Sequence, residues 1–168
     1  QPREDEKMKL QIALDTLSLE ECILLLEQTK GNVDIAEVGT PFIIEEGMRP
    51  VRELKKRFPE IEILADTKIM DAGELEASSA FKAGADIVTV LGVSNDETIL
   101  GAIKAAKQHG GKIMIDMIAV KNLVERAKEI DAMGVDYICV HTELKMINKV
   151  ICNAKSAVAG GVKLSTID

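Results

Sequence analysis

The sequence predicts an α/β fold, a (β/α)8 TIM-type barrel, on three observations. Short apolar runs alternate with longer segments of helical periodicity along the chain. The short runs carry Ile, Val and Leu on consecutive positions, which is typical of parallel strands buried on both faces. A glycine followed by an aspartate and a buried run recurs at Gly31, Gly84 and Gly134. Repeated βα units allow an open sheet or a closed barrel. The barrel is favoured, because no Gly-x-Gly-x-x-Gly motif follows the first strand.

The strands and helices are predicted in strict alternation. The strands cover Leu10–Asp15, Val33–Gly39, Ile61–Asp66, Ile87–Leu91, Lys112–Met117, Tyr137–His141 and Ala157–Gly160. The helices cover Ser18–Lys30, Arg49–Phe58, Gly73–Lys82, Asp96–His109, Val120–Met133 and roughly Leu144–Asn153. Capping boxes that begin at Ser18 and Ser94 mark two of the helix starts.

The length of the chain conflicts with a complete barrel. Eight βα units need at least about 200 residues, and the chain has 168. We therefore expect a barrel that lacks the eighth βα unit; the family resemblance described below implies in addition a long loop after the sixth strand, which this sequence lacks. A barrel this short would have weak or no activity and an exposed seam. Residues 1–7 are interpreted as an extension or tag, and residues 8–168 as one barrel domain.

Composition excludes several classes of function. A net charge of −7, one Tyr and no Trp argue against a nucleic-acid-binding protein, which needs a basic surface and stacking aromatic side chains. No apolar run approaches the ~18 residues of a membrane span. The three Cys have no metal-ligand spacing, and no signal peptide is visible, so we expect reduced thiols and a cytoplasmic location.

Ionisable residues gather at the carboxyl ends of the predicted strands. They are Asp15, Glu37, Asp66 with Lys68 and the following Asp71, Asp116 and His141. A charge at the end of a buried strand is costly unless it is paired or binds a metal, and barrel enzymes place their active sites at this end. The pattern therefore predicts an active site. The alternatives are structural: a helix cap for Asp15, an ion pair with a lysine for Glu37, a buried ion pair for Asp66 and Lys68, and a core histidine for His141.

Glu37 and Asp66 lie on neighbouring predicted strands and could bind one hard cation. Carboxylates without nearby Cys or His ligands favour Mg²⁺ over zinc. Gly160 and Gly161 could let a substrate phosphate approach backbone amides.

Other polar residues are interpreted as structural. Asp34, Asp86 and Asp136 precede strands at the opposite end of the barrel, His109 ends a helix, and Cys139 is a small core residue.

The third strand and its loop read Asp66-Thr-Lys68-Ile-Met-Asp71, which resembles the Asp-x-Lys-x-x-Asp motif of the orotidine-5′-phosphate decarboxylase superfamily. Within it, the chain is similar to the 3-hexulose-6-phosphate synthase family. The matching stretches include residues 10–15 (LQIALD), 37–41 (EVGTP), 64–73 (LADTKIMDAG), 137–142 (YICVHT) and 157–161 (AVAGG).

The resemblance implies an aldol addition of formaldehyde to ribulose 5-phosphate through an enediolate, with Mg²⁺, or Mn²⁺ in its place, as cofactor. Glu37 and Asp66 would hold the metal, and Lys68 would stabilise the enediolate. His141 would carry the proton. Asp15 and Asp116 would position substrate hydroxyls. Asp71 would serve the neighbouring subunit's site, which implies a homodimer with shared active sites.

Three alternatives stay open. Orotidine-5′-phosphate decarboxylases usually carry Lys where this chain has Glu37. The 3-keto-L-gulonate-6-phosphate decarboxylases typically have Glu at the position of Asp116 and an Arg shortly after the histidine, so Asp116 and His141-Thr-Glu-Leu-Lys145 fit the synthase better. The third alternative is a truncated homologue without catalytic activity.

Overall fold

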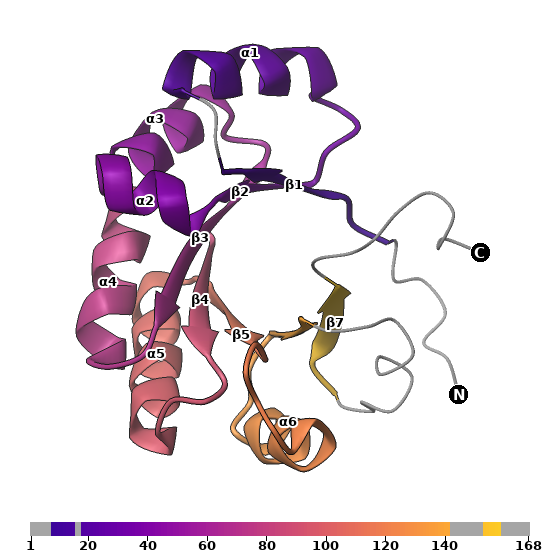
Figure 1. Cartoon of the computed structure of the whole chain (residues 1–168). Helices are drawn as coiled ribbons and strands as arrows, with labels where there is room; N and C mark the ends of the chain where they lie inside the picture. The colour runs from indigo at the N-terminus through magenta and orange to yellow at the C-terminus, as the bar shows by residue number, and fades with distance from the viewer. Residues whose placement is uncertain (1–7, 16–17, 142–152, 159–168) are drawn as a thin grey trace.

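One curved parallel sheet forms the centre of the protein. The computed structural model describes residues 8–15, 18–141 and 153–158. Its strands pair in sequence order, each parallel to the next (Figure 1). They are β1 (Gln11–Leu14), β2 (Ile35–Val38), β3 (Glu62–Ile69), β4 (Ile87–Leu91), β5 (Lys112–Asp116), β6 (Tyr137–Val140) and β7 (Lys155–Val158).

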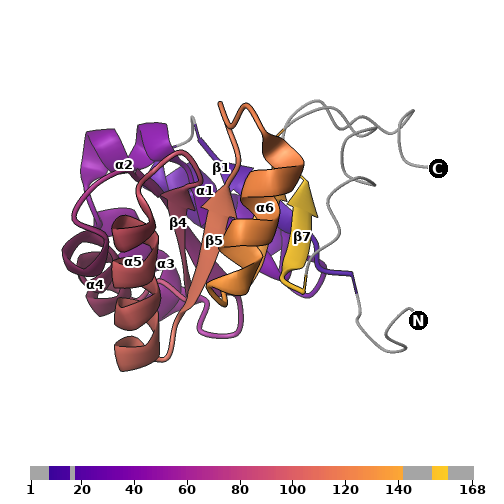
Figure 2. The ribbon, with the colours of Figure 1, turned by 90° about the horizontal axis from the view of Figure 1, so that it is seen from below.

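The helices lie on the outer side of the curved sheet, as both ribbon views show (Figures 1 and 2). They are α1 (Leu19–Thr29), α2 (Thr40–Glu46), α3 (Arg49–Arg57), α4 (Gly73–Ala83), α5 (Asp96–His109) and α6 (Leu123–Ala132). Helices outside a parallel sheet that curls in sequence order are typical of a TIM-type barrel, so the predicted fold class is confirmed. Among the described helices, none is long and apolar enough to cross a membrane.

Strands β2 to β6 are largely buried on both faces, which explains their continuous apolar sequences. In β3, Ile63 and Ala65 pack into the layer between sheet and helices, whereas Leu64 faces a second cluster. The second cluster lines the barrel interior and contains Ile35, Leu64, Ile87, Met114, Tyr137 and Cys139. Successive residues of a strand therefore serve two different cores.

Carboxylates tie neighbouring strands together at the amino-terminal end of the sheet. Each of three aspartates precedes an even-numbered strand and accepts a hydrogen bond from a main-chain amide near the start of the preceding strand. The pairs are Leu10 N to Asp34 at 2.8 Å, Ile63 N to Asp86 at 2.8 Å and Ile113 N to Asp136 at 2.9 Å. The structural interpretation of these aspartates is confirmed.

Several details of the predicted elements were wrong. Strand β3 runs on to Ile69, and β7 covers Lys155–Val158 where Ala157–Gly160 was predicted. Helix α2 was not predicted, because Thr40–Glu46 is short and begins with a Thr-Pro pair that reads as a turn. The capping box at Ser94 does not form: Asn95 is the N-cap residue of α5, and the Ser94 hydroxyl donates to the Leu91 carbonyl at 2.7 Å. The box at Ser18 is present.

The described residues contain no strand after β7. The loop after β6 and nearly all of the helix predicted over Leu144–Asn153 lie outside the described part of the chain.

Candidate active site

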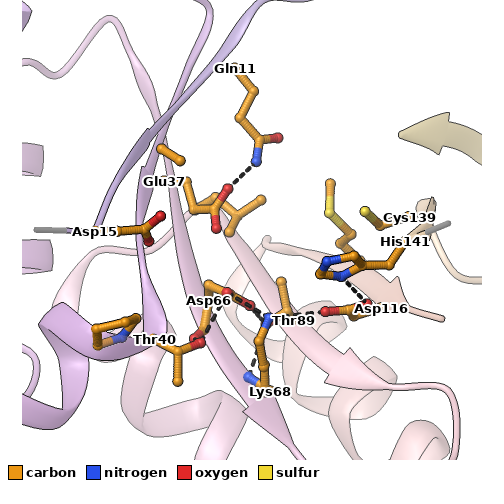
Figure 3. A pocket seen from close by; sticks show the side chains of 14 residues that line it. Gln11, Asp15, Glu37, Thr40, Asp66, Lys68, Thr89, Asp116, Cys139 and His141 are labelled. Carbon is orange, nitrogen blue, oxygen red and sulfur yellow. Dashed lines mark hydrogen bonds and ion pairs between the residues drawn. The ribbon is translucent and has the colours of Figure 1, made fainter. Parts of the chain in front are cut away.

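A pocket of about 410 Å³ lies at the carboxyl ends of the strands. Its polar lining comes from β1 to β5 and from the residues that follow β1, β2 and β6 (Figure 3). These polar residues are Gln11, Asp15, Glu37, Thr40, Asp66, Lys68, Thr89, Asp116 and His141. Leu64, Met114 and Cys139 belong both to the pocket lining and to the apolar interior cluster. The pocket therefore has charged walls and a floor formed by the apolar interior of the barrel.

A bulge in β3 brings two of the charged residues into this pocket. Ala65 pairs with Val88 and Ile69 pairs with Val90, so residues 66–68 of β3 stand opposite Thr89 alone. Lys68 has a φ of 47°, in the left-handed region. That conformation costs a residue with a side chain about 1–2 kcal/mol. Strain of this kind is found where a site requires a particular geometry.

A chain of polar contacts crosses the pocket from Asp66 to His141. Lys68 Nζ lies 2.8 Å from Asp66 Oδ2 and 3.0 Å from Asp116 Oδ2. Asp116 Oδ1 lies 3.0 Å from His141 Nδ1 and accepts from the Ile118 amide at 2.9 Å. Asp66 is only 7% exposed and Asp116 only 4%. One lysine thus bridges two buried carboxylates, the second of which also holds the histidine.

The contacts favour the ionised forms of Lys68 and Asp116. Burial by itself would lower the pKa of Lys68, but hydrogen bonds to Asp66 and Asp116 outweigh it and raise the pKa well above the usual range. Burial would raise the pKa of Asp116, but the Ile118 amide and Lys68 hold it below its usual value. Lys68 is therefore a permanent cation at neutral pH and cannot act as a base.

Glu37 has the opposite environment. Burial, together with the negative charge of Asp66, raises the pKa of Glu37 to about 7. The Gln11 side-chain amide donates a hydrogen bond to its carboxylate, which opposes this rise. Asp15 adds further negative charge nearby. The negative charge around Glu37 is thus larger than the neighbouring donors and cations of the protein can offset.

This excess negative charge bears on metal binding. Among the described residues, no group of three or more His, Cys, Asp or Glu side chains is arranged to hold a metal ion. Mg²⁺ is usually held by one or two carboxylates, with water and substrate oxygens completing its shell. Glu37 and Asp66 fit that requirement. Cys139 does not supply a competing soft ligand, because burial raises the pKa of its thiol to about 12.

The pocket gathers most of the predicted site residues. Asp15, Glu37, Asp66, Lys68, Asp116 and His141 all line it. Asp71 is exposed and is not among the described residues that line the pocket; its carboxylate accepts from the Ala72 amide at 2.7 Å. Gly160 and Gly161 lie outside the described residues.

Three polar residues of the pocket were missed: Gln11, Thr40 and Thr89. The Thr40 hydroxyl lies 2.7 Å from the Asp66 carbonyl oxygen and 2.9 Å from Asp66 Oδ2. Thr89 gives no warning in the sequence, because Thr is a common strand residue. Gln11 could have been found from its spacing, since it precedes Asp15 by an even number of positions and so shares its face.

Comparisons with known proteins agree with one another. The model of the orotidine 5′-phosphate decarboxylase / HUMPS family matches residues 8–166. A 3-hexulose-6-phosphate synthase of Bacillus subtilis (strain 168) is 50% identical over 173 aligned positions, which cover 95% of this chain and 82% of that protein.

Solved structures show the same relationship. The crystal structure of 3-hexulose-6-phosphate synthase from Salmonella typhimurium has a TM-score of 0.86 and 43% identity, covering 92% of this chain and 80% of that one. The crystal structure of KGPDC from Streptococcus mutans has a TM-score of 0.84 at 26% identity, covering 94% of this chain and 80% of that one.

Proposed function

Because the chain belongs to the orotidine 5′-phosphate decarboxylase / HUMPS family and is similar to 3-hexulose-6-phosphate synthases over most of their length, we propose that it catalyses their reaction. The enzyme is an aldehyde-lyase that adds formaldehyde to D-ribulose 5-phosphate and gives 3-hexulose 6-phosphate, the formaldehyde-fixing step of the ribulose monophosphate pathway. The observation that carries the proposal is the Lys68 ammonium group between Asp66 and Asp116, in the same pocket as Glu37 and His141.

His141 is the proton carrier in this proposal. Its Nδ1 faces Asp116 Oδ1, so the neutral ring donates from Nδ1 and keeps a lone pair on Nε2. Nε2 takes a proton from C1 of the sugar phosphate, and an enediolate forms. The C1 carbanion then attacks the formaldehyde carbon and forms the new C–C bond. The resulting alkoxide takes the proton back from Nε2, so no proton is gained or lost overall.

Lys68 stabilises the negative charge that develops in this reaction, and a metal ion held in the pocket would add to this stabilisation. Lys68 remains protonated and offers a fixed cation to the enediolate oxygens. Mg²⁺, or Mn²⁺ in its place, would be held by Glu37 and Asp66 and would act as a Lewis acid on an oxygen of the substrate. Asp15 and Asp116 would position substrate hydroxyls, and Gly160 and Gly161 would contact the phosphate.

A homodimer with shared active sites is part of the proposal. Asp71 is exposed, and the apolar side chains on either side of it are unusually open: Met70 is 53% exposed and Leu75 is 71% exposed. An exposed carboxylate between exposed apolar side chains suits an interface that carries Asp71 into a neighbouring pocket. A cytoplasmic location also belongs to the proposal, and the buried free thiols of Cys22 and Cys139 are compatible with it.

The test is formaldehyde consumption in the presence of ribulose 5-phosphate, with Mg²⁺ and with EDTA. We expect consumption by the parent protein only with the metal. Asp66→Asn should lower kcat/KM by at least about 100-fold, because it removes both a metal ligand and the partner of Lys68. Asp96→Asn is the matched control, since Asp96 forms an exposed ion pair with Arg126 outside the pocket.

A folded parent that consumes no formaldehyde would contradict the proposal. Release of CO₂ from 3-keto-L-gulonate 6-phosphate would then identify the decarboxylase alternative. Absence of both activities, together with no exchange of the C1 proton of ribulose 5-phosphate into D₂O, would leave the non-catalytic homologue.

A further inference from the structure

Thr89 holds the bulge of β3 from the neighbouring strand. Its hydroxyl donates to Asp66 Oδ1 at 2.7 Å and accepts from the Lys68 amide at 3.0 Å, and its carbonyl oxygen accepts from the Thr67 hydroxyl at 2.9 Å. These bonds replace the regular ladder between Ala65 and Ile69, where the register shifts. Three consecutive residues of β3 are thus fixed by one residue of β4.

The direction of each bond at the hydroxyl is determined. A threonine hydroxyl has one proton to donate. The Lys68 amide can only donate, so it occupies a lone pair of Thr89 Oγ1, and the hydroxyl proton is left for Asp66 Oδ1. Thr89 is 3% exposed, so water does not compete readily for this proton. The same atom therefore orients the Asp66 carboxylate and holds the left-handed main chain of Lys68.

Asp66 has little freedom to turn in this setting. Thr89 engages Oδ1, while Lys68 Nζ and the Thr40 hydroxyl lie 2.8 Å and 2.9 Å from Oδ2. The Lys68 side chain begins from a main chain that Thr89 also fixes. Loss of the Thr89 hydroxyl would leave the Lys68 amide and Asp66 Oδ1 without this partner at a buried position.

We propose that Thr89 is a positioning residue for the reaction, one that sets the orientation of both the Asp66 carboxylate and the Lys68 side chain for the metal and the enediolate. This inference rests on the proposed function. Thr89 does so through Asp66 and Lys68, not by touching the reacting atoms. Groups that orient metal ligands in this way commonly change metal affinity or activity by about 10-fold to 100-fold when they are removed.

The test uses two pairs of variants that differ only at the hydroxyl. Thr89→Val is compared with the parent, and Thr89→Ala is compared with Thr89→Ser, which leaves a similar space but keeps the hydroxyl. Mn²⁺ is the probe, and its binding to the substrate-free protein is measured by electron paramagnetic resonance of the free ion. We expect Val and Ala to weaken Mn²⁺ binding and to lower kcat, each by about 10-fold to 100-fold. Ser should retain most of both.

Thr29→Val is the matched control. Thr29 in α1 also donates one hydroxyl hydrogen bond, to the Leu25 carbonyl at 2.8 Å, but lies outside the pocket. It should leave Mn²⁺ affinity and kcat unchanged, even if it lowers the melting temperature. If Thr89→Val does not fold, the Ser and Ala pair decides alone.

Equal Mn²⁺ affinity and equal kcat for Thr89→Ala and Thr89→Ser would overturn the inference while the proposed function stood. A parent protein that neither binds Mn²⁺ nor fixes formaldehyde would instead refute the proposed function, and the inference would fall with it.

Discussion

The charge of Glu37 is poorly compensated by its surroundings. Burial and the negative charge of Asp66 raise its pKa to about 7, so the metal-free protein at pH 8 contains a half-buried carboxylate that the fold does not stabilise. A bound cation would remove that cost. The charge that makes the pocket suitable for a metal is therefore a source of instability without one.

The sign of the pH effect follows from the pKa. The unfolded chain releases the Glu37 proton near pH 4.5, whereas the folded protein retains it up to about pH 7. The folded state thus binds more protons between these values, and its stability falls as the pH rises through that window. In EDTA, Glu37→Gln should remove this loss and raise the free energy of unfolding at pH 8 by about 1–3 kcal/mol relative to the parent.

Urea unfolding at pH 5 and pH 8, with and without Mg²⁺, measures the effect. Glu60→Gln is the control, because Glu60 is exposed and should change nothing. Mg²⁺ should stabilise the parent at pH 8 and not Glu37→Gln. Equal stability of the parent and Glu37→Gln at both pH values would refute the charge argument.

Charged site residues were predictable from the sequence at this scale, and their threonine partners were not. Asp66, Lys68 and Asp116 stand out because ionised groups are rare at the ends of buried strands. Thr89 looks like any other strand threonine until its hydroxyl is seen between Asp66 and Lys68. These hydrogen bonds of Thr89 depend on the bulge of β3, and no feature of the sequence predicts that bulge.

At the scale of elements, the end of β1 and the turn after β2 fit together closely. A Cβ atom on Gly39 would lie only 1.8 Å from Asp15 Oδ1. The main chain of Gly39 has a φ of −65° and a ψ of 157°, which any residue can adopt. Glycine is therefore required here by the space that the Asp15 carboxylate occupies, and not by the main-chain conformation.

Gly39→Ala should push the Asp15 carboxylate out of its place and raise KM for ribulose 5-phosphate by about 10-fold, the loss expected for one hydrogen bond to a charged group. Steady-state kinetics provide the measurement. In an Asp15→Ala background the same Gly39→Ala change should have little further effect, since the carboxylate it displaces is gone. Additive losses in the double variant would show that Gly39 acts in another way.

Most of the elements could be predicted because buried parallel strands and capped helices have regular signatures. Helix α2 could not, since its 7 residues are too few to show a helical period. The extension of β3 to Ile69 was also missed. Its Asp-Thr-Lys segment carries charged side chains because it faces the pocket. Charged residues are not typical of a buried strand, so the sequence pattern did not predict that the strand continues here.

At the scale of the whole molecule, the predicted site residues fall into two kinds: those that line the pocket of their own chain, and Asp71, which does not. Asp66 and Lys68 line the pocket of their own chain, whereas Asp71 is exposed a few residues later. A shared site in a dimer would pair the Asp66 of one subunit with the Asp71 of the other. Inactivating these two residues on different chains therefore tests the assembly directly.

Asp66→Asn and Asp71→Asn should each abolish most activity as pure proteins. Co-expressed, the two variants should recover about a quarter of the parent activity, because half of a random dimer population is mixed and each mixed dimer has one intact site. The mixed dimer, purified by two different affinity tags, should show about half of the parent activity, because one of its two sites is intact. No recovery in that species would refute a shared site, and full activity of Asp71→Asn alone would refute a role for Asp71.

The aspartates at the amino-terminal end of the sheet join its strands in pairs through their side chains. Asp34, Asp86 and Asp136 each tie an even-numbered strand to the odd-numbered strand before it. The side-chain fastening at this end of the sheet thus repeats every two strands, and each pair of strands carries the carboxylate that joins it. A period of two strands is what tandem duplication of a two-strand unit would leave in a barrel.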